Sequence, residues 1–487
     1  MRHSLLLVVV LTACGAGSGR GIPPQAPTAL TPPAPEPKLV EEPAPVPAVQ
    51  TEYAEVAETI AAAAMADEEG WELLLQLCDD IGPRLSGSAA LDQAIEWAAG
   101  RMTAAGHENV RKEPVMVPRW TRGQERLTLL EPRGADMPLL GLGGTVGTGK
   151  KGVTAEVVAV ADEEGLEALG DGARGKIVLF NNPMPAYSRK DGTHYGHTVR
   201  FRINGPRLAA EKGAVGVLVR SVTARSLRSP HTGTMGSYGE GAKIPAAAIT
   251  TEDADLIWRW QQRGKTVKVK LELGAKHHGM VPSANVVGEL RGREKPEEIV
   301  VISCHLDSWD VGTGAHDDGG SCVAAMHALT LLRRTGLTPR RTVRAVLYTN
   351  EENGLEGAKA YASAHKGELH VAAVEADSGV HDPQAFSVDH KDEAARAASI
   401  DRLAETLPLF GPFRTEEAVS GYAGADISQL KPAGTTLVGL RSDMAKYFDY
   451  HHSHADTVDK VDKDEFRRTV GAMALLAYLL ADAETPF

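Results

Sequence analysis

Residues 299–320 read IVVISCHLDSWDVGTGAHDDGG, and this stretch decides the fold that we expect. It opens with the continuous apolar run Ile299–Ser303, which is typical of a strand buried on both faces of a sheet. His305 and Asp307 follow the run directly, and Asp317 lies in the glycine-rich segment beyond them. In open α/β sheets, ligands bind beyond the carboxyl ends of the strands, so these side chains mark a candidate site.

Three further apolar runs of the same kind follow along the chain: Val343–Tyr348, Val371–Ala376 and Thr435–Leu440. Helical periodicity accompanies them, most clearly over Ser321–Arg334 and Asp464–Ala481. The repeated strand-then-helix pattern predicts an α/β fold with a mostly parallel, mixed sheet and helices on both faces.

The chain before residue 281 divides into two further parts. Residues 55–119 show a helical pattern and then a strand over Val110–Val117, and we assign them to the first part of the main domain. Residues 120–280 hold short apolar strands, glycine-rich turns and one helix near Gly205–Lys212, which predicts an inserted α/β domain. Residues 281–487 form the second part of the main domain and carry all the candidate ligands.

The composition argues against nucleic acid as a partner. Lysine and arginine total 52 against 64 aspartates and glutamates, so the formal net charge of −12 repels phosphate. Hydrophobic residues make up 43% of the chain and charged residues 24%, a balance typical of a globular protein with a sizeable core. Four cysteines do not make a disulfide framework in 487 residues, and we interpret Cys78, Cys304 and Cys322 as buried free thiols.

The N-terminal residues are typical of an export signal. A basic residue precedes the apolar run Leu5–Leu11, which is too short to span a bilayer. The segment Leu11-Thr12-Ala13-Cys14 resembles the lipobox of bacterial lipoproteins, in which the cysteine is acylated and the signal is cut before it. This resemblance implies a signal peptide over residues 1–13, a lipid on Cys14 that attaches the chain to a membrane, and a location at the bacterial cell envelope. Residues 14–54, rich in proline and alanine, predict an extended tether.

Carboxylates and imidazoles follow all four apolar runs. They are His305 and Asp317, then Glu351-Glu352, then Asp377, and finally the segment His451–Thr457. Each motif alone is more often a solvated turn or an exposed helix start, but their occurrence together and in order favours one site. Nitrogen and oxygen donors without thiolate suit zinc in a hydrolytic site, with manganese or cobalt as substitutes. Two metal ions need a carboxylate between them at a separation of roughly 3.5–4 Å, and Asp317 can present both of its oxygens.

These motifs resemble the family of co-catalytic zinc aminopeptidases and carboxypeptidases. The resemblance rests on residues 305–312 (HLDSWDVG), 317–320 (DDGG) and 351–354 (EENG), on the histidine-rich motif that ends at Asp456-Thr457, and on residues 82–88 (GPRLSGS). It covers about residues 55–480. It implies a zinc-exopeptidase fold with two zinc ions per chain and a small peptide as substrate. In that family the insert corresponds to a protease-associated domain that roofs the active-site cleft.

Carried over residue by residue, the resemblance implies that His305 and Asp377 bind one zinc ion. Glu352 and His452 would bind the other ion, and Asp317 would bridge the two. We choose His452 over its neighbours because it fits the His-x-x-x-Asp-Thr register of the family's motif.

The resemblance also assigns two catalytic side chains. Glu351 would be the general base, and Asp307 would orient the ring of His305 by a hydrogen bond. The family has a cis peptide bond after the bridging aspartate, which would place one between Asp317 and Asp318 here.

The remaining histidines receive structural interpretations. His451 and His454 are expected to contact substrate or support the site, and His316 is expected to point away from it. The pairs His277-His278 and His194 with His197 are expected at the surface of the insert.

The expected reaction is hydrolysis of short peptides, of the carboxypeptidase or dipeptidase type, by a water held at two zinc ions. An aminopeptidase is the alternative, because specificity depends on the roof and on the loop Ser420–Asp426. A free amine would need a carboxylate such as Asp426, and a free carboxylate would need a cation such as Arg441 or Lys446. We reject a metal-free binding protein on the same scaffold because the ligand set is complete. The sequence is compatible with a homodimer.

Overall fold

The computed structural model describes residues 47–487. The expected signal peptide, Cys14 and most of the expected tether lie outside these residues. Helix α1 (Ala48–Met65) begins before residue 55, so the predicted end of the tether at residue 54 was wrong. Among the described helices, none combines the length and the apolar character that a membrane span needs.

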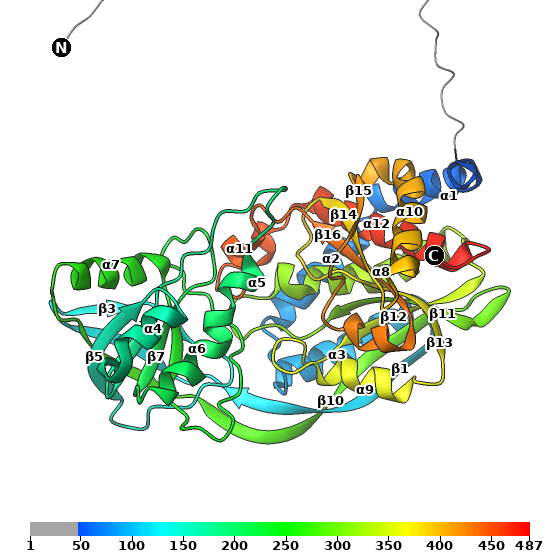
Figure 1. Ribbon diagram of the computed structural model, residues 1–487. Coiled ribbons are helices and arrows are strands. Elements are labelled where there is room, and N and C mark those ends of the chain that lie inside the picture. The colour runs from blue at the N-terminus through cyan, green and yellow to red at the C-terminus, as the bar shows by residue number, and fades with distance from the viewer. Residues whose placement is uncertain (1–46) are drawn as a thin grey trace, which may run out of the picture. The chain divides into compact units, whose positions relative to one another are not determined.

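The main domain is built on one mixed sheet of eight strands (Figure 1). Its four central strands, in the order β12-β11-β13-β16, are parallel to one another. They are β12 (Arg341–Tyr348), β11 (Lys295–His305), β13 (Leu369–Glu375) and β16 (Thr436–Ser442). The flanking strands are β1 (Glu108–Thr121) and β10 (Lys276–Leu290) on one side, and β14 (Pro383–Asp389) and β15 (Glu417–Ser420) on the other. The predicted, mostly parallel mixed sheet is confirmed.

Helices cover both faces of this sheet, because successive residues of a buried strand point to opposite sides. On one side, Val300 and Ile302 of β11 belong to the core formed with α1, α2 (Glu69–Leu75), α3 (Ala89–Ala104), α8 (Gly320–Arg334) and α12 (Lys463–Asp482). On the other side, Ile299 and Val301 belong to the core formed with α9 (Glu356–Ala364) and the short helix Ile427–Ala433. Helix α10 (Glu393–Thr406) packs near β14 and β15.

The insert has its own eight-stranded sheet, in the order β3-β2-β9-β5-β6-β7-β8-β4. The strands are β2 (Glu125–Glu131), β3 (Ala135–Met137), β4 (Leu139–Gly141), β5 (Val153–Val160), β6 (Ile177–Phe180), β7 (Gly216–Arg220), β8 (Ala246–Ile249) and β9 (Lys268–Leu273). The helix predicted near Gly205–Lys212 corresponds to α6 (Arg200–Glu211). That helix is confirmed, and the insert also contains α4 (Glu163–Leu169), α5 (Tyr195–Thr198) and α7 (Thr251–Gln262), which the sequence pattern did not reveal.

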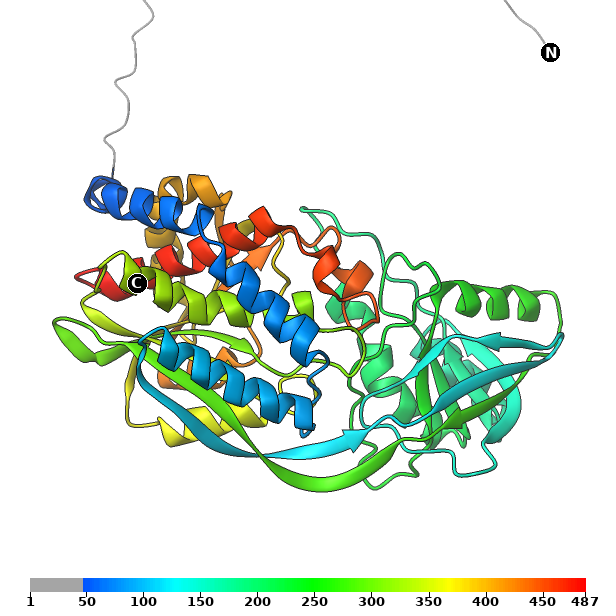
Figure 2. The ribbon, with the colours of Figure 1, turned by 180° about the vertical axis from the view of Figure 1, so that it is seen from behind.

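Two long strands connect the insert to the main domain. β1 and β10 pair antiparallel from Glu108 opposite Glu289 to Thr121 opposite Lys276. Figure 2 shows this two-stranded ribbon running from the helices of the main domain to the insert. The predicted limits at residues 119/120 and 280/281 therefore fall inside continuous strands.

Candidate metal centre

The candidate ligands come from the carboxyl ends of the parallel strands. His305 is the last residue of β11, Glu351 and Glu352 follow β12, and Asp377 follows β13. His452 follows the short helix α11 (Tyr447–Tyr450), which the chain enters after β16. Because parallel strands end at the same edge of a sheet, segments far apart in the sequence deliver their side chains to one place.

One half of the centre gathers around His305. Its Nε2 atom lies 3.3 Å from Oδ1 of Asp317 and 3.6 Å from Oδ1 of Asp377. The three ligand atoms lie within 4.8 Å of one another, a spacing that could hold a metal ion. His305 and Asp317 are buried, while the Asp377 side chain is partly exposed.

The other half gathers around His452. Its Nε2 atom lies 3.2 Å from Oδ2 of Asp317 and 3.1 Å from Oε2 of Glu352. Asp317 thus turns one carboxylate oxygen to each half, which is the arrangement expected of a carboxylate that bridges two metal ions.

The buried charges of this centre fit a bound cation. Among residues 47–487, Oδ2 of Asp317 and Oε1 of Glu352 are buried without a hydrogen-bond partner. Burial raises the pKa of Glu352 to about 7. Burial lowers the pKa of His452, but the carboxylates of Glu352 and Asp317 outweigh it and raise that pKa to about 10. Uncompensated buried carboxylates are costly, and a divalent metal ion with oxygen and nitrogen ligands compensates them.

Of the two histidines expected to contact substrate or support the site, His451 lies at the centre, whereas His454 does not line the cavity. The His451 ring stacks on the His452 ring with centroids 3.6 Å apart, and its Nε2 lies 3.6 Å from Asp317 Oδ2. Within the described chain, only His452 of the two forms an ion pair with Glu352, so its choice as the ligand agrees with the geometry. His454 is exposed.

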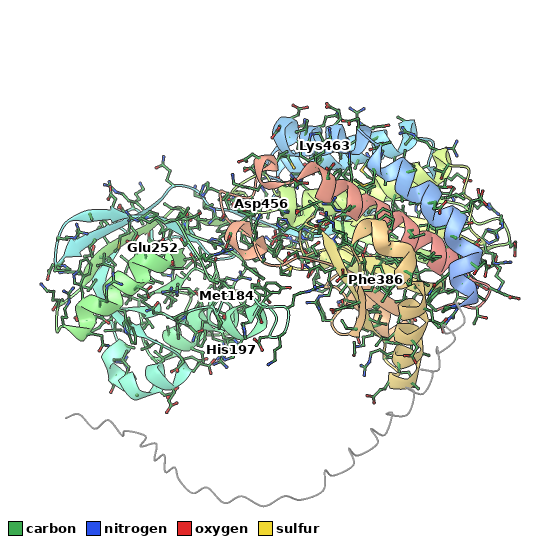
Figure 3. All side chains as sticks on the ribbon, turned by 90° about the horizontal axis from the view of Figure 1, so that it is seen from above. Met184, His197, Glu252, Phe386, Asp456 and Lys463 are labelled. Carbon is green, nitrogen blue, oxygen red and sulfur yellow. A yellow bond between two sulfur atoms is a disulfide. The ribbon has the colours of Figure 1, made fainter. Side chains whose placement is uncertain are left out.

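The other histidine predictions are confirmed for four residues out of five. His316 turns its ring to the main-chain oxygen of Lys460 and the main-chain nitrogen of Val380, away from the centre. His277 and His278 are exposed. His197 of the insert is exposed as well (Figure 3), whereas His194 is half-buried.

The loop that carries Asp317 is held from several sides. Asp456, which lies where the insert and the main domain meet in the view of Figure 3, accepts the N–H groups of His316 and Asp317 at 2.8 and 3.1 Å. The buried guanidinium of Arg84 donates to the main-chain oxygens of Leu306, Thr313 and Gly314. The expected cis peptide bond between Asp317 and Asp318 is present.

A disulfide closes the same loop. Cys304, at the end of β11, is bonded to Cys322 in the first turn of α8. The interpretation of these two residues as free thiols was wrong, because the fold brings their Cα atoms to 5.1 Å. Cys78 is a buried free thiol, as predicted.

Asp307 acts differently from the prediction. The Nδ1 atom of His305 lies 2.9 Å from the main-chain oxygen of Asp307, whereas the nearest carboxylate oxygen of Asp307 lies 3.9 Å away. The main-chain carbonyl therefore orients the imidazole. The carboxylate instead accepts the main-chain N–H of Glu351 at 3.1 Å and so fixes the turn that bears the predicted base.

Glu351 faces the open space beside the centre. It is half-buried and lines a cavity of about 840 Å³ together with Asp317, Glu352, Asp377 and His452. Burial raises the pKa of its carboxyl well above the ordinary value, and Asp377 and Glu352 add to the shift. A carboxylate with a raised pKa at this position is suited to accepting a proton.

Both domains line this cavity. The insert contributes Tyr195 and Arg202, and the main domain contributes Tyr422 and Arg441. The predicted roof over the site is therefore present. Of the residues proposed to read a terminal charge, Arg441 lines the cavity, but Lys446 does not.

Asp426 does not reach the cavity either, so its proposed role in binding a free amine was wrong. Its side chain is buried, and the preceding residues Ala423 to Ala425 line the cavity instead.

Comparisons with known proteins agree with this architecture. The profile of Peptidase family M28 matches residues 285–477, and that of the PA domain matches residues 153–257. Carboxypeptidase Q of Mus musculus is 41% identical over 417 residues, covering 85% of this chain and 86% of the relative. The solved structure of a Peptidase M28 precursor from Shewanella amazonensis superposes with a TM-score of 0.84 at 35% identity, covering 90% of this chain and 98% of that one. A zinc aminopeptidase from Bacillus subtilis shares the fold, with a TM-score of 0.61 at 19% identity over 85% of this chain and 95% of the other.

Proposed function

This chain belongs to peptidase family M28 and is a metallo-exopeptidase, and we propose that it hydrolyses short peptides, dipeptides above all, at a centre of two zinc ions. The observation that carries the proposal is the position of Asp317, whose two oxygens face His305 on one side and His452 on the other.

The proposed ligand sets follow from the two halves of the centre. His305 and Asp377 would hold one ion, Glu352 and His452 the other, and Asp317 both. Bound zinc would supply Lewis-acid polarisation of the scissile carbonyl and of the attacking water. A metal-free binding protein would have no use for this complete set of donors, four of which are buried.

The protein's own residues would move the proton. Glu351 lies beside the ligands at the cavity wall, where it can take a proton from water and pass it to the leaving amine. Its main chain is fixed by Asp307, so its carboxylate is presented from a rigid turn.

The shape and charge of the cavity support a short substrate with free ends. The insert roofs the site, and such an enclosed space admits a chain end more easily than a mid-chain loop. Two guanidinium groups, of the exposed Arg441 and the buried Arg202, line it and could pair with a substrate carboxylate. Glu375 also lines the cavity wall, and its carboxylate could pair with the free amine of a substrate. This contact would favour the alternative, an aminopeptidase.

Blocking either end of a dipeptide tests the substrate. We expect the free dipeptide to be cleaved, and both its N-acetylated and its C-amidated forms to be resistant, because each block removes a charge that the enclosed site must pair. Release of free amino acids from the three matched compounds is the measurement. Cleavage of the amidated form with loss on acetylation would make the enzyme an aminopeptidase. Cleavage of the acetylated form alone would make it a carboxypeptidase without need of a free amine.

We further propose that the chain is exported and anchored by a lipid on Cys14. The lipobox-like segment Leu11–Cys14 motivates this, and the Cys304–Cys322 disulfide supports export, because disulfides persist in oxidising compartments.

Changing the proposed lipid site tests the anchor. Cys14→Ser should abolish labelling with a fatty-acid probe and release the protein from the membrane fraction, since the thiol is the acylated group. The measurement is fractionation of cells that express either form. The control is Cys78→Ser, because Cys78 is a buried thiol distant in sequence from the lipobox-like segment. Equal membrane association of the Cys14→Ser and wild-type proteins would exclude a lipoprotein.

A further inference from the structure

The insert touches the metal centre itself, through the main chain around His452. Nδ1 of His231 lies 2.6 Å from the main-chain oxygen of His451. The main-chain N–H of Thr232 donates to the oxygen of His452 at 2.9 Å. Two consecutive residues of the insert thus bind two consecutive carbonyl groups of the loop that carries a proposed zinc ligand.

The backbone of His452 needs such support. Its φ angle is +58°, in the left-handed region that residues with a side chain rarely adopt. A conformation of this kind persists only where surrounding contacts hold it. The bonds from His231 and Thr232 hold the peptide units before and after the Cα of His452, so they oppose a return of this residue to an ordinary conformation.

The carbonyl of Thr232 also faces the His452 ring. Nδ1 of His452 lies 3.4 Å from this oxygen. Nη1 of Arg202 lies 3.3 Å from the same oxygen and 3.4 Å from Nδ1 of His452. With a metal ion held at Nε2, the neutral imidazole would carry its proton on Nδ1, where the carbonyl of Thr232 can accept it. The lone pair is then left on Nε2, the atom that faces Asp317 and Glu352. Histidines that bind metal are oriented in this way by a carbonyl behind the ring.

The His231 ring contacts only the loop that carries His452 through its polar atoms, within residues 47–487. Its ring is buried, and its other nitrogen, Nε2, has no hydrogen-bond partner within residues 47–487. The bond from Nδ1 to the His451 carbonyl is the one polar contact that the ring makes in this part of the chain.

The insert is fixed against the same region by two further contacts. Nη2 of Arg122 lies 2.6 Å from a carboxylate oxygen of Asp310, in the loop between His305 and Asp317. Gly143 packs so closely on the Trp309 ring that an added Cβ would lie 2.0 Å from it. Trp309 in turn lies beside His452, with ring centroids 5.6 Å apart.

We propose that the insert is a structural part of the metal centre, in which His231 and Thr232 position His452, so that the Glu352–His452 half of the centre binds its ion tightly only when the insert is docked. The proposal rests on the proposed two-zinc function. It makes His231 a positioning residue, which contacts neither substrate nor metal.

Two amide substitutions at His231 test this role. Asn places an N–H donor near the position of Nδ1 and keeps the bond to His451, whereas Gln places its donor near Nε2 and loses that bond. Zinc binding to the full-length wild-type protein and to both variants is measured by equilibrium dialysis against buffered zinc. The melting temperature of each protein is recorded.

We expect the wild type and His231→Asn to bind two zinc ions with similar affinities. His231→Gln should keep one site unchanged and weaken the other by about 10–100-fold, with turnover restored at high zinc. If His231→Gln does not fold, His231→Leu provides the same comparison.

Two results would overturn the proposal. One is unchanged affinity of both sites in the Gln variant, and the other is equal weakening in the Asn and Gln variants. If the wild type itself bound fewer than two zinc ions, the proposed two-zinc function would fail instead.

Discussion

Replacing Glu351 by glutamine should lower turnover by about 10²–10⁴-fold while the protein keeps its metal. Glutamine preserves the shape of the side chain but cannot take up the proton of the attacking water. The main chain should stay in place, because Asp307 binds the N–H of residue 351 and does not depend on the side chain. Within the described residues, the Glu351 carboxylate forms no ion pair with a histidine, whereas the Glu352 carboxylate pairs with His452.

Glu352 provides the matched control for this prediction. It is the next residue in the chain and bears the same side chain, but it contacts His452 at 3.1 Å. Glu352→Gln should therefore lose zinc as well as activity, and excess zinc should restore part of the turnover. Turnover and zinc content are measured on both variants in parallel. Near-normal turnover of Glu351→Gln would show that another group is the base, and loss of its zinc would make Glu351 a ligand.

The order of the elements explains why most of the site could be predicted from the sequence. Each apolar run is a strand of the parallel part of the sheet, and the first polar residues after it must lie at one edge. His305, the Glu351-Glu352 pair and Asp377 meet for this reason. His452 is different, because helix α11 intervenes after β16, and only the register of its motif selected it from its neighbours.

The features that the sequence did not predict depend on proximity between segments. The bond between Cys304 and Cys322 requires the end of β11 to lie beside the first turn of α8, and cysteine number alone does not reveal this. The His305 ring turns to the carbonyl of Asp307, a group that every residue has, so no residue type signals it. The same holds for the carbonyl of Thr232 behind His452, which comes from another domain. Main-chain groups do much of the positioning here, and the sequence does not mark them.

Replacing Asp317 by alanine should remove metal from both halves of the centre and abolish turnover. Its two oxygens lie 3.3 Å from His305 and 3.2 Å from His452, so the substitution takes one proposed ligand from each ion. It also removes the anion that offsets the repulsion between two dications roughly 3.5–4 Å apart, so the loss should exceed that of an ordinary ligand.

Asp377→Ala is the control that separates a bridging ligand from a terminal one. Asp377 contacts His305 and has no ion pair with His452 in the described chain, so this variant should lose one ion and keep the other. Each protein is stripped with a chelator, dialysed against zinc and assayed for metal content and peptide hydrolysis. We expect two ions and restored activity for the wild type, about one ion for Asp377→Ala, and almost none for Asp317→Ala. Equal losses in the two variants would contradict the bridge, because a carboxylate that served a single ion would have no greater effect than Asp377.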